Sequence, residues 1–348
     1  MTYIFLRIII VLLNIFYLYC AYLVINVSTI YGVIVSIRMW GVFRIIPDMF
    51  MYNCCKLCPR SCGVNRNDAI SFCNNSSKVK IAKAYLHYYE EPCISGNNGS
   101  GTIFFSGCNL RCVYCQNKEI SHNNFGANVS IERFAQIMIE LQNKKANNIN
   151  LVTPTHFVPS IIEAIKIARK NGLNIPIIYN TSGYESVDTI KLLNGYIDIY
   201  LTDFKYFNND IALKYSKVNN YFESASGAIN EMKKQIPNNI YDDNGILKKG
   251  IIVRHLILPN NTLDSKNILK YLFNNYGNTI IYSIMNQYTV LEKLEFDELN
   301  RGISDDEYDS VINFACDLGI TNAYVQEGGT VSDSFIPQFD LEGVKNSE

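Results

Sequence analysis

From residue 102 onward, short apolar runs alternate with longer segments whose apolar residues recur every three or four positions. That spacing gathers apolar side chains on one face of a helix. In segment 130–146 Ser130 can cap the helix, and Gly172 suits a left-handed position at the end of segment 158–172. The helical patterns lie at 130–146, 158–172, 186–195, 225–235, 265–277 and 305–319. The apolar runs, which predict strands, lie at 102–107, 148–153, 175–183, 197–206, 249–259, 279–288 and 322–327.

Strands that alternate with helices indicate β-α-β crossovers and therefore a parallel sheet. About six crossover units favour an α/β fold of the partial (β/α)6 TIM-barrel type over an open doubly wound sheet. No glycine-rich dinucleotide fingerprint follows the first predicted strand. In such barrels the active site lies at the carboxyl ends of the strands, and here those ends carry cysteines and other polar residues.

The pattern divides the chain into four parts. Residues 1–46 form an apolar segment, and residues 47–98 form a cysteine-rich segment. Residues 99–326 contain the alternating strands and helices, and residues 327–348 read as a C-terminal tail.

The apolar segment contains the run "YIFLRIIIVLLNIFYLYCAYLVINV", which predicts a helix of about the length that crosses a bilayer. Arg7, Asn14 and Asn26 interrupt it. Three interpretations stay open: a membrane anchor, an uncleaved signal-like segment, and sequence upstream of a true start at Met49 or Met51.

The composition is that of a folded protein: 348 residues, of which 48% are hydrophobic and 18% charged, with a formal net charge of −1. A chain of this length can bury a sizeable core. A near-neutral balance without a basic stripe argues against nucleic acid as the main partner. Small molecules or proteins are the expected partners.

Cysteine is unusually abundant, with eleven residues in the chain, nine of them between Cys54 and Cys115. Clustering in a long α/β chain favours metal ligation over a disulfide framework. Cys108, Cys112 and Cys115 have the spacing Cys-x3-Cys-x2-Cys directly after the first predicted strand. Three thiolates can hold zinc or three corners of an iron–sulfur cluster, and either leaves one position open.

A second set of cysteines lies upstream. Cys55, Cys58 and Cys62 are closely spaced, and Cys73 follows. Four such residues fit a zinc knuckle or a further iron–sulfur cluster, and the spacing does not identify the metal. The alternative is a set of buried thiols.

The three-cysteine motif, with the aromatic residue Tyr114 before its last cysteine, resembles that of the radical SAM superfamily. The surrounding sequence is similar to the PflX-like branch of proteins related to pyruvate formate-lyase activating enzyme. The similarity covers about residues 55–325. The matching stretches are "CKLCPRSCGVNR", "EEPCISGNNGSGTIFFSGCNLRCVYCQNKEIS", "NINLVTPTHFVP", "YNTSGYE", "DIYLTDFKY", "VRHLILP" and "MNQY".

The resemblance implies a [4Fe–4S] cluster whose free iron binds S-adenosylmethionine (SAM). It implies reductive cleavage of SAM to a 5′-deoxyadenosyl radical, which abstracts hydrogen from a substrate. An electron donor such as flavodoxin or ferredoxin is then needed. A glycyl-radical enzyme is the expected protein substrate. The catalytic domain would be cytoplasmic, with membrane contact only if residues 1–46 are expressed.

The resemblance also assigns site residues. Cys108, Cys112 and Cys115 would be the cluster ligands, and Tyr114 would lie near the adenine. A Gly-Gly-Glu stretch that usually binds the SAM amino group is replaced here by "TPTH", so Thr155 or His156 would supply that contact. The remaining expected cofactor contacts are Asn180, Ser182, Asp203, Lys205 and Arg254.

Simpler interpretations of these residues stay open. Asp203 and Lys205 could form a structural ion pair, and His156 could bond only to backbone. Because side chains alternate along a strand, Arg254 and His255 cannot both point inward. Two other functions also remain: radical modification of a different protein or metabolite, and a non-catalytic iron–sulfur electron-transfer module.

Overall fold

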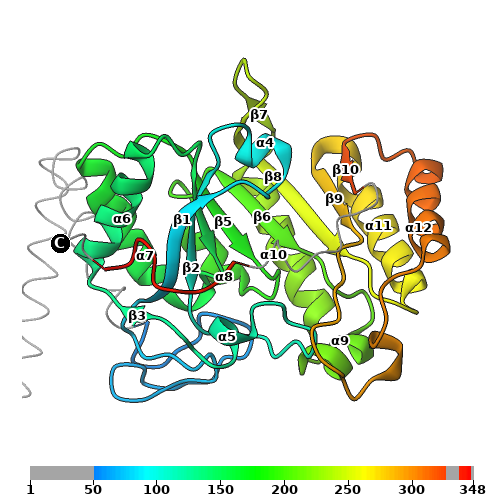
Figure 1. Cartoon of the computed structure of the whole chain (residues 1–348), viewed down its shortest axis with the longest axis horizontal. Helices are drawn as coiled ribbons and strands as arrows, with labels where there is room; N and C mark the ends of the chain where they lie inside the picture. The colour runs from blue at the N-terminus through cyan, green and yellow to red at the C-terminus, as the bar shows by residue number, and fades with distance from the viewer. Residues whose placement is uncertain (1–50, 327–336, 346–348) are drawn as a thin grey trace, which may run out of the picture. The chain divides into compact units, whose positions relative to one another are not determined.

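The computed structural model describes residues 51–326 and 337–345 (Figure 1). The expected apolar helix within residues 1–46 lies outside the described residues. Among the described residues, no helix is long and apolar enough to cross a membrane.

A largely parallel sheet forms the centre of the fold and confirms the expected partial-barrel class. Its strand order is β10-β9-β8-β6-β5-β4-β2-β1-β3, with β7 paired to β8. All neighbouring pairs from β2 to β10 along this order are parallel. The parallel strands are β2 (Ser100–Phe105), β4 (Ile149–Val152), β5 (Ile177–Thr181), β6 (Ile199–Asp203), β8 (Leu247–Leu256), β9 (Ile281–Met285) and β10 (Ala323–Val325).

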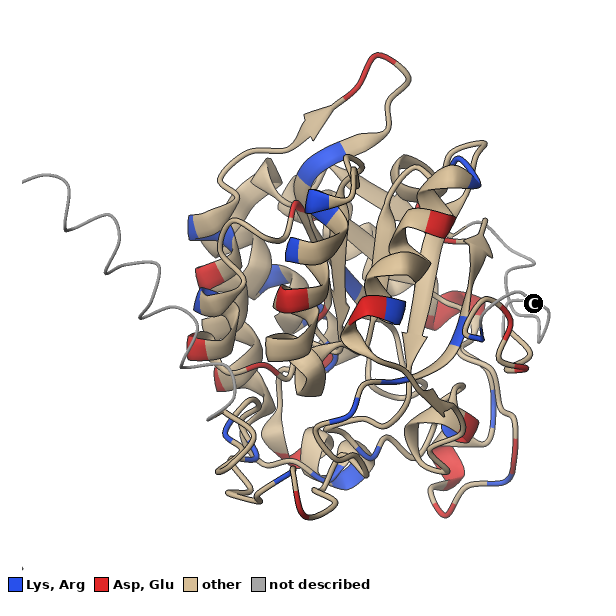
Figure 2. Ribbon diagram, turned by 90° about the vertical axis from the view of Figure 1, so that its left-hand side faces the viewer, with Lys and Arg blue, Asp and Glu red and all other residues tan. Residues whose placement is uncertain are grey.

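Helices connect these strands and cover the outer face of the sheet (Figure 1). Ser130 caps the first long one by accepting a hydrogen bond from Arg133 N, and Gly172 has a φ of +96°, as the sequence predicted. The helices are α6 (Ile131–Asn143), α7 (Val158–Lys170), α8 (Val187–Leu192), α9 (Asn209–Ser216), α10 (Tyr221–Gln235), α11 (Thr262–Tyr276) and α12 (Asp305–Leu318). Basic and acidic residues are interspersed along them (Figure 2).

Several elements were not expected from the sequence pattern. The strand β1 (Lys80–His87) runs antiparallel to β2 and also pairs with β3 (Ala127–Asn128), while β7 (Ile240–Tyr241) pairs with β8. The short helices α4 (Pro92–Ser95) and α5 (Lys118–Ser121) and the helix α9 were also missed. The elements α4, α5, β3 and β7, each of two to four residues, are too short to show a clear hydrophobic period, whereas β1 and α9, with eight residues each, were missed in spite of their length.

The two faces of the sheet bury different clusters. Outward-facing side chains such as Leu151 and Tyr179 join the large core beneath the helices. Inward-facing side chains such as Ile199 and Ile252 form a smaller cluster with Cys93 and Ile94 of α4. The helices α4 and α5 lie at opposite ends of the sheet (Figure 1). Because α4 packs at the amino-terminal ends of the strands, it closes that end of the barrel.

The cysteine-rich segment has no helix or strand between residues 51 and 79, yet it is well packed. Arg66 is fully buried and donates hydrogen bonds to the carbonyl oxygens of His156 and Ser76. Thr189 Oγ1 donates to Leu57 O over 2.8 Å. The segment continues directly into β1, so it is joined to the barrel through the sheet.

The described part of the C-terminal tail lies against β1. Leu341 N donates to Ala82 O over 3.1 Å, and Ala84 N donates to Glu342 O over 2.8 Å. The buried amine of Lys83 forms ion pairs with Asp340 and Glu342. Residues 337–345 therefore satisfy backbone groups along β1 that would otherwise be an exposed sheet edge.

Candidate active site

A cavity of about 470 Å³ lies at the carboxyl ends of the parallel strands. In a barrel these ends converge, so side chains far apart in the sequence meet there. Most of the residues expected to bind a cofactor line this cavity, namely Cys108, Cys112, Tyr114, Cys115, Asn180, Ser182, Asp203, Lys205 and Arg254.

The three-cysteine loop is fixed to the end of α9. Val113 N donates to Tyr215 O over 2.9 Å, and Arg111 N donates to Ser216 O over 3.3 Å. Because these bonds use the backbone on both sides of Cys112, they hold its thiol in a defined place. This contact was not expected from the sequence pattern, since α9 was not predicted.

Each of the three thiols has a hydrogen-bond partner. Cys108 Sγ accepts from Leu110 N over 3.4 Å, and Cys112 Sγ accepts from Ser216 Oγ over 2.9 Å. Cys115 Sγ lies 3.2 Å from Ser121 Oγ. These donors stabilise thiolates of the kind that ligate iron.

Burial raises the pKa of the Cys108 thiol to about 12 and that of the Cys112 thiol to about 11. At neutral pH such thiols ionise when a cation binds them, since metal ligation displaces the proton. The donor set and its environment therefore fit a cluster bound at the three cysteines.

The turn after β5 presents a polar atom without a partner. Ser182 Oγ is buried, lines the cavity and has no hydrogen-bond partner among the residues that the structure describes. The next residue, Gly183, has a φ of +78°, and a Cβ there would lie 2.1 Å from Asp203 O. A buried hydroxyl without a partner is costly, so this atom is suited to bind a ligand of the cavity.

A buried carboxyl group, Glu185, supports this turn and was missed at the sequence level. Thr155 Oγ1 donates to Glu185 Oε1 over 2.6 Å, and Thr181 Oγ1 donates to the same atom. Thr181 Oγ1 in turn accepts from Gly183 N over 3.3 Å. Burial raises the pKa of Glu185 to about 7, and the hydroxyl donors oppose that rise only in part.

Asp203 and Lys205 form an ion pair over 2.6 Å at the end of β6. Burial acts against the charge of Lys205, but Asp203 and Cys112 outweigh it and raise the pKa of the amine. Both residues line the cavity, so the ion pair and a place in the site are compatible. The nearby positive charge of Lys205 also favours a thiolate at Cys112.

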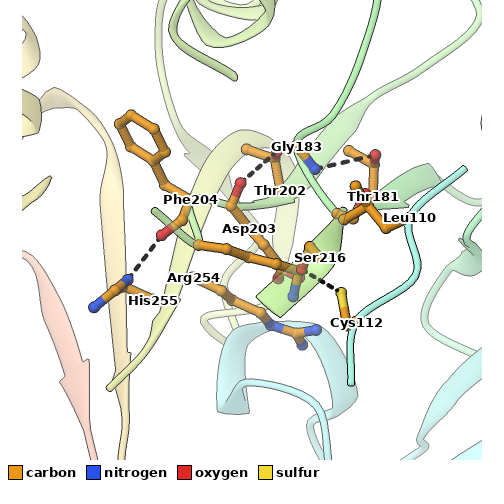
Figure 3. Close-up of polar contacts among 12 residues, drawn as sticks. Leu110, Cys112, Thr181, Gly183, Thr202, Asp203, Phe204, Ser216, Arg254 and His255 are labelled. Carbon is orange, nitrogen blue, oxygen red and sulfur yellow. Dashed lines mark hydrogen bonds and ion pairs between the residues drawn. The ribbon is translucent and has the colours of Figure 1, made fainter. Parts of the chain in front are cut away.

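Arg254 lines the cavity but differs from the expectation of a free clamp for a carboxylate. Its Nε and Nη2 atoms each donate to Glu91 over 2.7 Å, and Nη2 also donates to Glu90. Burial disfavours its charge, yet the two carboxylates raise the pKa of Arg254. The Nε–Nη2 edge of the guanidinium is therefore taken by this chain's own carboxylates. His255 points outward, where its Nδ1 contacts Phe204 O (Figure 3).

Tyr114 is part of the cavity wall, whereas Thr155 and His156 are not. Thr155 is 1% exposed and bonds to Glu185. His156 is 3% exposed, and its Nε2 contacts Ser106 O over 2.8 Å. The strand β4 reaches the cavity through Val152 and Thr153 instead. The structure thus favours the interpretation in which His156 bonds only to backbone.

The upstream cysteines remain close in sequence but do not form a clear metal site. Cys55 accepts a hydrogen bond from Arg66 Nη1, and Cys73 Sγ lies 2.9 Å from Ser71 Oγ. In residues 51–326 and 337–345, no three His, Cys, Asp or Glu side chains are arranged to hold a single metal ion. The same holds for Cys108, Cys112 and Cys115, but those three thiols match the cluster motif of the superfamily that the sequence resembles, whereas nothing else supports a second metal at Cys55, Cys58, Cys62 and Cys73.

The fold and site together define a class, an α/β-barrel protein with three thiols at the mouth of its cavity. A model of the radical SAM superfamily matches residues 102–272. The uncharacterized protein MJ0674 of Methanocaldococcus jannaschii is 31% identical over 275 residues, which is 75% of this chain and 74% of that protein.

Two solved structures also resemble this chain. The SAM-bound SuiB of Streptococcus suis has 11% identity and a TM-score of 0.44, and the match covers 64% of this chain and 49% of SuiB. The FeFe-hydrogenase maturase HydG of Carboxydothermus hydrogenoformans has 13% identity and a TM-score of 0.40, over 68% of this chain and 56% of HydG. This chain thus spans about half the length of these two enzymes.

Residues 102–272 of the chain therefore form a radical SAM superfamily domain. Membership implies an enzyme that uses SAM together with a [4Fe–4S] cluster. The thiols and the unpartnered hydroxyl of the cavity fit those two cofactors.

The raised pKa of Glu185 predicts that the stability of the fold depends on pH. Its folded-state pKa of about 7 exceeds the ordinary value of 4.5, so its contribution to stability is full below pH 4.5 and is lost as pH rises through 7. The unfolding free energies of the native chain and of Glu185→Gln are compared at about pH 5.5 and about pH 8. Over that interval we expect the unfolding free energy to fall by about 2 kcal/mol more in the native chain than in Glu185→Gln. Urea unfolding at both pH values measures this.

The exposed carboxylate of Glu163 provides the control, because Glu163→Gln should keep the pH dependence of the native chain. Equal losses in the native chain and in Glu185→Gln would contradict the prediction.

Proposed function

We propose that this protein is a radical SAM enzyme that generates a 5′-deoxyadenosyl radical in its barrel cavity and abstracts hydrogen from a substrate. The observation that carries the proposal is the meeting of three thiols, one buried and two partly buried, and an unpartnered hydroxyl in one cavity at the strand ends. When bound, the [4Fe–4S] cluster and SAM supply the one-electron cleavage that produces the radical.

The chain's own residues hold and orient these cofactors. Cys108, Cys112 and Cys115 would ligate the cluster, and the bonds of the loop to α9 fix its position. Ser182 Oγ would bond to a polar group of SAM. In the Asp203–Lys205 pair and the Arg254 cluster every charged group has a partner, and because Glu90 and Glu91 share Arg254, the wall keeps one net negative charge. A cavity closed at its far end by α4 limits the access of water to a reactive radical.

As a finer proposal, the substrate is a glycyl-radical enzyme, from which a backbone glycine loses hydrogen. Its support is the order of motifs from "CKLCPRSCGVNR" to "MNQY", which is similar to that of activating-enzyme relatives. Another protein or a metabolite is the alternative substrate. A non-catalytic electron carrier is the weaker alternative, because it has no need of a cavity of about 470 Å³ beside the thiols.

Replacement of the three thiols tests the reaction class. The anaerobically reconstituted, reduced chain should form 5′-deoxyadenosine from SAM, whereas Cys108→Ala/Cys112→Ala/Cys115→Ala should form none because it lacks the cluster ligands. Chromatography of the product and iron analysis measure both effects. Cys316→Ala is the matched control, since this thiol is exposed and outside the cavity. A chain that binds cluster and SAM yet forms no product with any reductant would contradict the proposal.

Substitution of Ser182 tests where SAM binds in the cavity. We expect Ser182→Ala to weaken SAM binding about fivefold, the equivalent of one ordinary hydrogen bond. Calorimetric titration of SAM into the reconstituted chain measures this. Ser186→Ala is the control, because Ser186 lies four residues on, at the start of α8, and is not in the cavity wall. Unchanged affinity in Ser182→Ala would place SAM elsewhere.

The finer proposal has its own test. Incubation with pyruvate formate-lyase, SAM and a reductant should produce the electron paramagnetic resonance signal of a glycyl radical, and the triple-cysteine variant should produce none. Formation of 5′-deoxyadenosine without that signal would point to another protein or a metabolite as substrate.

A further inference from the structure

A chain of hydroxyl groups runs from the cavity wall to one of the three loop cysteines. Tyr114 OH lies 2.6 Å from Tyr206 OH, which lies 2.6 Å from Ser216 Oγ. Ser216 Oγ then donates to Cys112 Sγ over 2.9 Å, the bond drawn as a dashed line in Figure 3. Tyr206 and Ser216 are 1% and 0% exposed, so water does not compete for these bonds.

The direction of every bond follows once Cys112 is a thiolate. A thiolate has no proton, so Ser216 gives its single proton to Cys112 Sγ. Ser216 Oγ must then accept from Tyr206, whose oxygen must in turn accept from Tyr114. Each inner hydroxyl donates once and accepts once. Bonds arranged head to tail in this way polarise one another, and the low dielectric of the interior strengthens them.

The backbone holds this chain in place. The carbonyl oxygen of Ser216 accepts from Arg111 N, and that of Tyr215 accepts from Val113 N. The same short segment therefore anchors the cysteine loop by its backbone and reaches Cys112 by its side chain. Tyr206 packs edge-on against Tyr221, with ring centroids 5.3 Å apart.

The other two cysteines have local partners. Cys108 Sγ accepts from the backbone of Leu110, two residues away. Cys115 Sγ contacts Ser121 Oγ, which also lies 2.8 Å from His122 Nδ1. Cys112 differs because its donor comes from a separate helix and is followed by two tyrosines, the buried Tyr206 and the partly buried Tyr114.

We propose that Ser216, ordered by Tyr206 and Tyr114, is a positioning residue that raises the reduction potential of the cluster held at Cys112. The inference rests on the proposed function, because it requires a cluster at the three cysteines. A hydrogen bond to a ligating sulfur withdraws negative charge and so favours the more negative, reduced state. One electron enters from an external one-electron donor, and no proton leaves the chain of hydroxyls.

The test is a redox titration of the reconstituted full-length chain with dithionite and mediators, followed by electron paramagnetic resonance of the reduced cluster. At the potential where half of the native clusters are reduced, we expect the reduced-to-oxidised ratio to fall about threefold in Ser216→Ala, a change within the range of one hydrogen bond. Tyr206→Phe should give a smaller fall and Tyr114→Phe the smallest. Ser216→Thr, which keeps the hydroxyl, should restore the ratio.

Ser224→Ala is the matched control. Ser224 Oγ donates to a backbone carbonyl of its own helix, that of Asn220, and is not in the cavity wall, so its loss should leave the potential unchanged.

The outcomes separate this inference from the proposed function. Native potentials in Ser216→Ala and Tyr206→Phe, each with full iron and sulfide content, overturn the inference and leave the proposed function intact. If Ser216→Ala fails to bind a cluster, Tyr206→Phe decides the matter: a lowered potential supports the inference and a native one overturns it. Absence of any cluster in the native chain overturns both proposals.

Discussion

The pairing of charges inside a low-dielectric barrel is the constraint on which this structure depends. The five charged side chains of the cavity wall all have a partner of opposite sign. Arg254 from β8 bonds to Glu90 and Glu91 from the segment between β1 and α4, and Asp203 pairs with Lys205. An unpaired charge at these positions would cost several kcal/mol, so the pairs fix the arrangement of the strand ends. Below them, the apolar contacts of α4 seal the barrel.

This arrangement leaves two kinds of group for ligands. The three thiols stand on a loop whose backbone is held by α9, and burial raises the pKa of Cys108 and of Cys112. Ser182 Oγ has no hydrogen-bond partner in the described part of the chain. The charged groups of the cavity wall are already paired. The three thiols and the Ser182 hydroxyl are therefore the groups that a cofactor would bind. Preorganisation of this kind lets binding proceed without rearrangement of the site.

Much of the fold could be predicted from the sequence because the parallel strands appear as apolar runs and their helices repeat apolar residues every three or four positions. The expected α/β class, the cap at Ser130 and the turn at Gly172 are confirmed. The elements β1, α4 and α9 were not predicted, although β1 and α4 help to close the barrel and α9 holds the cysteine loop. Whether these elements form depends on contacts with distant segments of the chain. A local sequence pattern carries no information about such contacts.

The sequence by itself determined the family and the three-cysteine loop, since spacing and residue type specify what thiols can ligate. Only the tertiary structure decided which other polar residues reach the cavity. It placed Ser182 and Asp203 in the wall and left Thr155 and His156 outside it, although all follow strand ends. In the folded chain Arg254 donates hydrogen bonds to two carboxylates. Ser216 donates to Cys112, from which it is separated by 104 residues in the sequence. The physical reason is that strand direction and burial select a side chain's neighbours, and both are properties of the packed sheet.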